Sequence, residues 1–139
     1  MTERIPELRR RIDLPTLVRY AGASGDFNPI HYDESYALAA GLDGVIGHGM
    51  LAMALVSEAV TDWIGDSGLV QSLSVRFTSP YRLVDVLTVG GEVVDRDGEA
   101  AELRLTCFNQ DGVEVIGRAT ATVLSERSDD DGEGTERDL

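Results

Sequence analysis

The sequence contains no lysine, only one cysteine and only two histidines in 139 residues. The single cysteine, Cys107, excludes an internal disulfide or a metal cluster built on cysteines, and we expect it to be a small buried strand residue. No apolar run is long enough to span a bilayer, because the longest, residues 49–60, is interrupted by Ser57 and Glu58. No basic and apolar signal segment opens the chain, so we expect a cytoplasmic protein.

Positive charge is also scarce. All twelve basic residues are arginines, against 25 acids, and the formal net charge is -13 at pH 7. This charge repels nucleic acid and anionic membranes, so we expect neither as a partner. The last fifteen residues contain seven acids, two arginines and almost no apolar side chains. We therefore expect one folded domain over residues 1–124 and a disordered acidic tail over residues 125–139.

In the first half of the chain, the spacing of apolar residues predicts helices. Residues 4–12 favour an edge strand, residues 13–22 favour a short helix that ends at Gly22, and residues 33–40 favour another short helix. Over residues 49–64 the apolar side chains cover most of the circumference of a helix. This pattern predicts a helix buried in the middle of the fold.

After residue 68, apolar and polar residues alternate, which predicts four strands with one apolar face each. The alternation covers residues 73–77, 87–93, 103–107 and 113–123. Asp97-Gly98 and Asp111-Gly112 predict tight turns, so the last three strands should form an antiparallel meander. A buried helix followed by such a sheet predicts an α+β hot dog fold, in which the sheet curls around the helix. Its unpaired edge makes a dimer the expected assembly.

The loop "GDFNPIH", residues 25–31, places Asp26 five residues before His31. A carboxylate beside an imidazole can hold a water molecule and exchange protons with it near neutral pH. Asn28 lies between them, and its amide offers a donor and an acceptor that could fix the loop or the water. We expect Asp26 and His31 to be catalytic and Asn28 to support them. The alternative is an exposed turn with two solvated side chains.

The segment "GHGM", residues 47–50, comes directly before the predicted buried helix. The first turn of a helix has N–H groups without intrahelical partners, and the helix dipole favours negative charge there. Gly49 has no side chain to shield its N–H, which could therefore stabilise a developing oxyanion. For His48 we expect a supporting role that shapes the turn before the helix.

Two other interpretations fit less well. Ser57 as a nucleophile lacks the surrounding motif of a nucleophile elbow. A metal site would gather Asp26, His31, Asp33 and His48, but their spacing matches no known ligand pattern, so we expect no metal and no cofactor. Hydration or dehydration beside a carbonyl needs only an acid/base pair and an oxyanion site, both of which the sequence offers.

The stretch "YAGASGDFNPIHYDESYA", residues 20–37, together with "GHGML" and "SVRFTSP", resembles the MaoC-like hydratase/dehydratase family. That family includes (R)-specific enoyl-CoA hydratases and (3R)-hydroxyacyl dehydratase subunits of type II fatty-acid synthesis. The resemblance runs from about residue 5 to residue 124. It implies a hot dog fold, a homodimer or a heterodimer with another hot dog subunit, and a thioester substrate on coenzyme A or acyl carrier protein.

Position by position, the resemblance assigns the catalytic pair to Asp26 and His31 and the oxyanion N–H to Gly49. The family's active-site serine falls on Ser57, which would then be a supporting hydrogen-bonding residue. The implied reaction adds water to C3 of a trans-2-enoyl thioester, or eliminates it from a (3R)-hydroxyacyl thioester. The alternatives are an acyl-CoA thioesterase and an acyl-binding subunit of a heterodimeric dehydratase.

Overall fold

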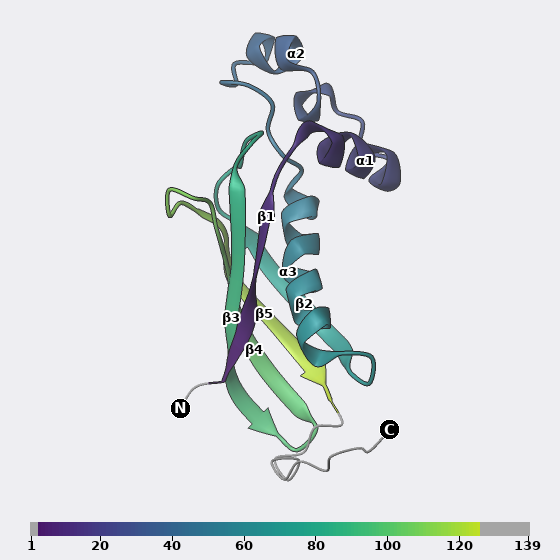
Figure 1. Ribbon diagram of the computed structural model, residues 1–139, viewed down its shortest axis with the longest axis vertical. Helices are drawn as coiled ribbons and strands as arrows, with labels where there is room; N and C mark the ends of the chain where they lie inside the picture. Colours follow the sequence, from purple (N-terminus) through teal and green to yellow (C-terminus); the bar gives the residue numbers. More distant parts are fainter. Residues whose placement is uncertain (1–2, 126–139) are drawn as a thin grey trace, which may run out of the picture.

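Five strands form one antiparallel sheet in the computed structural model, which describes residues 3–125 (Figure 1). The strands are β1 (Arg4–Arg11), β2 (Leu69–Phe77), β3 (Val86–Asp97), β4 (Ala100–Phe108) and β5 (Glu114–Leu124). Their order in the sheet is β1-β3-β4-β5-β2, so β1 and β2 are its edges. The predicted meander of β3, β4 and β5 is confirmed, and Gly98 and Gly112 adopt the positive φ of 61° and 76° that the tight turns need.

The long helix α3 (Gly49–Ile64) lies against one face of this sheet and contacts all five strands (Figure 1). The buried side chains of α3 are Leu51, Ala52, Leu55, Val56, Ala59, Val60 and Ile64, and they pack against buried strand residues in one core. The predicted hot dog fold is confirmed. The helix is buried on one side only, however, because Met50 is 55% exposed and Ala54, Thr61 and Asp62 are also exposed.

Three short helical segments connect β1 to α3: α1 (Leu14–Ser24), the 3-10 turn η1 (Pro29–His31) and α2 (Glu34–Ala39). The predicted end of α1 at Gly22 is wrong. Gly22 continues the helix, and Gly25 ends it with a φ of 77° and an N–H bonded to the carbonyl oxygen of Ala21 at 2.9 Å. A glycine is tolerated inside a helix, whereas the left-handed residue after a helix is the position that glycine fills best.

At the end of β5, Ser125 is buried, and its N–H donates to the carbonyl oxygen of Glu99 at 2.8 Å. The rest of the predicted acidic tail, residues 126–139, lies outside the described residues. Within residues 3–125, none of the helices has the length and apolar character needed to cross a membrane.

Candidate active site

The imidazole of His31 is buried in the 3-10 turn η1, and its orientation is fixed by a backbone group. Its Nδ1 lies 2.9 Å from the carbonyl oxygen of Ile46. Because a carbonyl oxygen can only accept, Nδ1 carries the hydrogen and the neutral ring presents its lone pair at Nε2. His31 can therefore accept a proton at Nε2 without losing the contact that orients it.

The carboxylate of Asp26 faces this nitrogen. Its Oδ2 lies 3.6 Å from His31 Nε2, and its Oδ1 accepts the N–H of Asn28 at 3.3 Å. The 3.6 Å separation is too long for a direct hydrogen bond. Both facing atoms are acceptors when the imidazole is neutral, so one water molecule can donate a hydrogen to each. The Asp26 side chain is about half exposed, which leaves access for that water.

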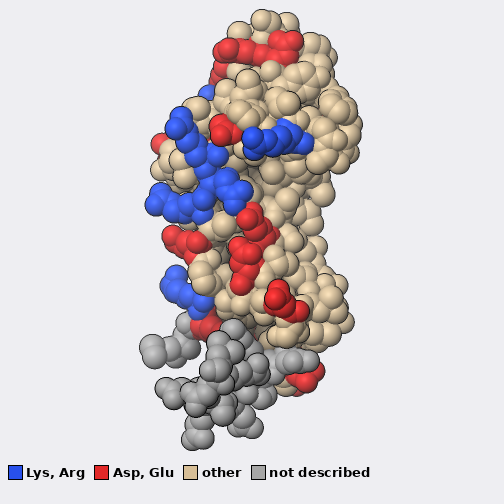
Figure 2. All heavy atoms as spheres, turned by 45° about the vertical axis from the view of Figure 1, so that its right-hand side comes forward, with Lys and Arg blue, Asp and Glu red and all other residues tan. Residues whose placement is uncertain are grey.

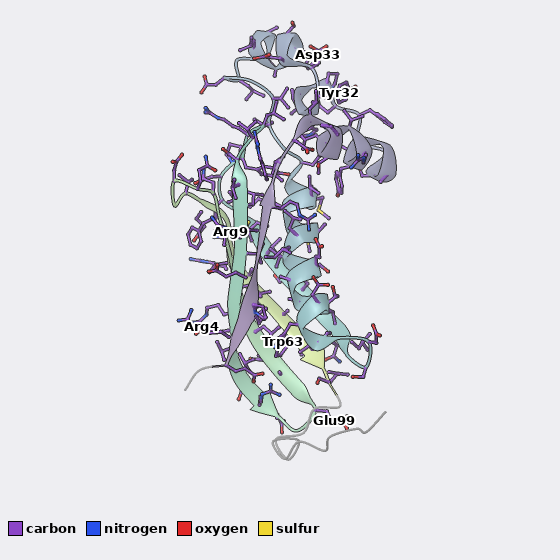
Figure 3. The ribbon with its side chains drawn as sticks, viewed as in Figure 1. Arg4, Arg9, Tyr32, Asp33, Trp63 and Glu99 are labelled. Atoms are coloured by element: carbon purple, nitrogen blue, oxygen red, sulfur yellow. The ribbon has the colours of Figure 1, made fainter. Side chains whose placement is uncertain are left out.

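Asn28 organises the loop between the two residues rather than facing the pocket. Its side-chain oxygen accepts the N–H of Ile30 at 3.3 Å, and its carbonyl oxygen accepts the N–H of His31 at 3.1 Å. Tyr32 adds a bond from its hydroxyl to the carbonyl oxygen of Phe27 at 2.8 Å. In Figure 3, Tyr32 lies at the end of the molecule that carries α1 and α2, and Trp63 lies toward the opposite end of α3.

A pocket of about 360 Å³ opens beside His31. Its walls include His31, Gly47, Gly49, Phe77, Tyr81 and Val115. The loop and the first residue of α3 thus meet at one cavity. The volume lies at the lower end of the range for small-molecule sites.

The amino terminus of α3 is open toward this pocket. No side chain caps it, so the N–H groups of its first turn are available to a ligand. A side chain at Gly49 would first meet the ring of Phe77, at 3.4 Å, and would shield those groups. Gly47, two residues earlier, leaves no room for any side chain because the ring of Tyr81 occupies the space. The arrangement suits an anionic oxygen held at the helix terminus.

His48, directly before α3, contacts both Asp26 and His31. These contacts go beyond the turn-shaping role expected from the sequence. Its side chain is only 1% exposed, and its Nε2 lies 3.2 Å from the backbone carbonyl oxygen of Asp26. Its ring stacks on His31 with centroids 3.8 Å apart. Burial lowers the pKa of His48, so the ring is neutral near neutral pH.

Tyr81 is a site residue that sequence reasoning missed. Its hydroxyl donates to the carbonyl oxygen of His48 at 2.6 Å, and burial raises the pKa of this phenol, so it stays a donor. The only available signal was an aromatic residue in the segment "SPYR", between two predicted strands. Nothing in the sequence pattern connects that segment to His48.

Ser57 is not among the residues that line the pocket. It lies eight residues after Gly49 on α3, which corresponds to about 12 Å along a helix axis. Its side chain is half-buried. The supporting role that the resemblance implies for Ser57 stays a prediction.

The geometry also bears on a metal site. Asp26, His31 and His48 offer ligand atoms within 4.8 Å of one another, whereas Asp33 caps α2 by accepting the N–H of Tyr36 at 3.1 Å. The two imidazole planes are only 24° from parallel. Because imidazole lone pairs lie in the ring planes, stacked rings do not direct both lone pairs at one ion. The cluster fits proton transfer better than metal binding.

The chain matches the family model described as MaoC like domain over residues 2–108. It is 35% identical over 89 residues to the beta subunit of 3-oxo-4,17-pregnadiene-20-carboxyl-CoA hydratase of Mycobacterium tuberculosis, covering 64% of this chain and 69% of that protein. It is 31% identical over 121 residues to an (R)-specific enoyl-CoA hydratase of Rhodospirillum rubrum, covering 84% and 83%. The solved structure of R-hydratase PhaJ1 from Pseudomonas aeruginosa matches with a TM-score of 0.85 and 31% identity, over 92% of this chain and 83% of that one. The chain therefore belongs to the MaoC-like domain family.

Proposed function

We propose that the protein is a hydro-lyase that adds water to trans-2-enoyl thioesters and removes it from (3R)-hydroxyacyl thioesters. The observation that carries this proposal is the pairing of His31 Nε2 with Asp26 Oδ2 at 3.6 Å, beside a pocket that Gly49 lines. The names of two relatives, an enoyl-CoA hydratase and a steroid-CoA hydratase subunit, support the same reaction class. No step of this reaction requires a cofactor.

In the hydration direction, a water molecule first donates one hydrogen bond to Asp26 and one to His31. As its oxygen forms a bond to C3, the pair takes up one of its protons, and the electrons of the C2–C3 double bond move toward the thioester oxygen. The pair then returns a proton to C2, so that one water is added in total. Dehydration follows the same steps in reverse.

The enolate-like oxygen formed during this step needs stabilisation. We assign that role to the N–H of Gly49 at the amino terminus of α3, where no side chain competes for it. The helix dipole adds to this attraction. Stabilisation of the oxyanion by the backbone leaves Asp26 and His31 free for proton transfer.

We further propose that the protein works as a homodimer or as a heterodimer with another hot dog subunit. The edge strand β2 carries Leu69 and Phe77, which are 61% and 50% exposed, and Met50 at the start of α3 is 55% exposed. Phe77 also lines the pocket. A partner on this side would cover apolar surface and close the open side of the site. One relative is itself named as a beta subunit.

The thioester carrier, coenzyme A or acyl carrier protein, has phosphate groups that basic side chains would bind. Arg82, in the segment before β3, is paired with Asp43 at 2.7 Å. Figure 2 shows most of the basic side chains of one face gathered in its upper half, with acidic ones both above and below them. Strand β1 supplies three successive arginines, Arg9, Arg10 and Arg11, and of these Arg10 is paired with Glu58.

A cytoplasmic location stays a prediction.

The direct test is hydration of crotonyl-CoA and of longer enoyl thioesters on both carriers, followed by the loss of enoyl absorbance. We expect turnover by the wild-type protein and its loss in His31→Ala. Release of free thiol from acyl-CoA would indicate a thioesterase instead. The third possibility is a non-catalytic subunit. In that case this chain would be folded but inert alone, and its Asp26→Asn variant would still make a separate partner subunit active.

A further inference from the structure

His48 lies where the catalytic loop meets the start of α3, and it contacts both members of the proton-transfer pair. Its Nε2 is 3.2 Å from the carbonyl oxygen of Asp26. Since that oxygen can only accept, Nε2 carries the hydrogen and donates it. The bond holds the backbone of the residue whose carboxylate faces His31.

The same ring supports the imidazole of His31. The two ring centroids lie 3.8 Å apart at an interplanar angle of 24°, and the edge of Tyr20 packs on His48 with centroids 4.8 Å apart. The bond to Ile46 orients His31 at one edge, and His48 restrains it on one face. One buried side chain therefore sets the positions of both groups.

Packing alone does not explain an imidazole at this place. Its Nδ1 is buried and has no hydrogen-bond partner among residues 3–125. An unsatisfied buried acceptor is destabilising, and a phenylalanine ring would fill the space without one. The nitrogen that is satisfied, Nε2, is the one that holds Asp26.

The surroundings keep this ring neutral. The titratable groups that face it are Tyr20 from α1, Asp26 from the loop, His31 from η1 and Tyr81 from the segment before β3. Burial is the largest influence on the pKa of His48 and lowers it. The bond to the Asp26 carbonyl and the Asp26 carboxylate oppose this effect, and the neighbouring His31 adds to it, so that the net shift is downward. A neutral ring donates through Nε2 only, which suits a bond to one carbonyl oxygen.

We propose that His48 is a positioning residue that keeps Asp26 and His31 in register by bonding the backbone of one and stacking on the ring of the other. This inference rests on the proposed function, because it assumes that these two residues transfer protons. His48 does not line the pocket, so it acts through its neighbours and not on the substrate.

Two variants of His48 separate its two contacts. His48→Phe keeps a flat ring against His31 and removes the donor, whereas His48→Gln keeps an N–H donor of similar reach and removes the ring. We expect each to lower kcat for crotonyl-CoA hydration at least about tenfold and to change KM less than about threefold, because misplaced catalytic groups slow the chemical step while substrate contacts remain. A smaller loss of kcat in either variant, or a larger change in KM, would overturn the double role.

A measurement on the wild-type protein tests the bond between His48 and Asp26 even if the variants do not fold. Nitrogen-15 NMR of labelled histidines should show His48 as the neutral Nε2–H tautomer from about pH 8 to pH 7. An Nδ1–H tautomer or a charged ring in that range would contradict the bond to Asp26. This readout needs no turnover. A wild-type protein that is inert both alone and with candidate partner subunits would refute the proposed function, while the placement of His48 would still be tested separately.

Discussion

At the scale of single residues, Asp26 and His31 each use one polar atom to hold their place, and the second polar atom of each faces the other residue. Asp26 Oδ1 accepts the N–H of Asn28 and His31 Nδ1 donates to Ile46, which leaves Oδ2 and Nε2 facing each other. The sequence could predict this pair because both residues lie within one short loop. It could not predict the contacts of His48 or Tyr81, because these depend on segments that meet only in the folded chain.

Gly49→Ala should separate the oxyanion role from folding. Gly49 has no positive φ and the added methyl group would meet only the half-exposed ring of Phe77 at 3.4 Å, so we expect a folded protein. Because the methyl group would shield the first N–H groups of α3, kcat for hydration should fall about 100-fold to 1000-fold. Stopped-flow or steady-state kinetics on crotonyl-CoA measure this.

Gly22→Ala is the matched control. Gly22 is inside α1, has open space around its Cα and does not line the pocket. This change should leave kcat unaltered and raise the free energy of unfolding by about 0.5–1 kcal/mol, since alanine favours a helix over glycine. Full activity in Gly49→Ala would contradict the assignment of the oxyanion site.

The buried neutral ring of His48 should make stability depend on pH. Burial lowers the pKa of His48, so the folded state binds fewer protons at this ring than the unfolded state does. The contribution of the neutral His48 ring to the free energy of unfolding is therefore greatest above the ordinary imidazole pKa of about 6.5. This contribution is lost as the pH falls through that value toward the lower pKa of the folded state.

His48→Gln lacks this titrating ring and provides the comparison. Between about pH 7.5 and pH 5.5, its midpoint of thermal unfolding should fall less than that of the wild-type protein. Calorimetry at several pH values measures the difference between the two midpoints. Parallel curves for the two proteins would mean that His48 is not buried in its neutral form.

At the scale of the elements, the alternation of apolar residues predicted the meander of β3, β4 and β5, and the apolar run predicted α3. The pairing of β1 with β3 and of β2 with β5 could not be predicted, because periodicity reports which face is buried and not which strands are neighbours. The sequence pattern also failed to predict that one side of α3 is exposed. Its apolar pattern predicts more burial than a single chain provides.

The turn before β3 contains a strained residue that no sequence signal indicated. Val84 has a φ of 66°, which a β-branched residue rarely adopts, and its N–H donates to the carbonyl oxygen of Ile12 at 2.7 Å. Val84→Gly should keep this bond, relieve the strain and raise the free energy of unfolding by about 1 kcal/mol. Chemical denaturation measures this change.

Val94→Gly is the control for that change. Val94 is also exposed, at 45%, but lies inside β3 without a positive φ. Glycine there should lower the free energy of unfolding by about 0.5–1 kcal/mol. A loss of stability in both variants would contradict the claim that Val84 is strained.

At the scale of the whole molecule, several large apolar side chains are exposed, among them Leu69 and Phe77 on the edge strand β2 and Met50 at the start of α3. Exposed apolar side chains do not contribute to solubility, which the net charge of -13 at pH 7 supports. The proposed dimer would cover Leu69, Phe77 and Met50.

Leu69→Arg tests the proposed interface without touching the pocket, which Leu69 does not line. We expect the wild-type protein to sediment as a dimer, alone or with its partner subunit, and Leu69→Arg to shift it toward the monomer, because a charge would be buried at the contact. Analytical ultracentrifugation measures the mass. A wild-type monomer that hydrates enoyl thioesters at full rate would contradict the proposed dimer.

The most direct test of the account is the rate of crotonyl-CoA hydration by wild-type protein, Asp26→Asn and Asp33→Asn. Asparagine retains the shape of Asp26 and an acceptor for the Asn28 N–H, so folding should be unaffected, while kcat should fall at least about 100-fold because the proton-accepting carboxylate is lost. Asp33→Asn, at a helix cap where asparagine serves equally well, should retain wild-type kcat. Activity of Asp26→Asn within tenfold of wild type would contradict the central claim.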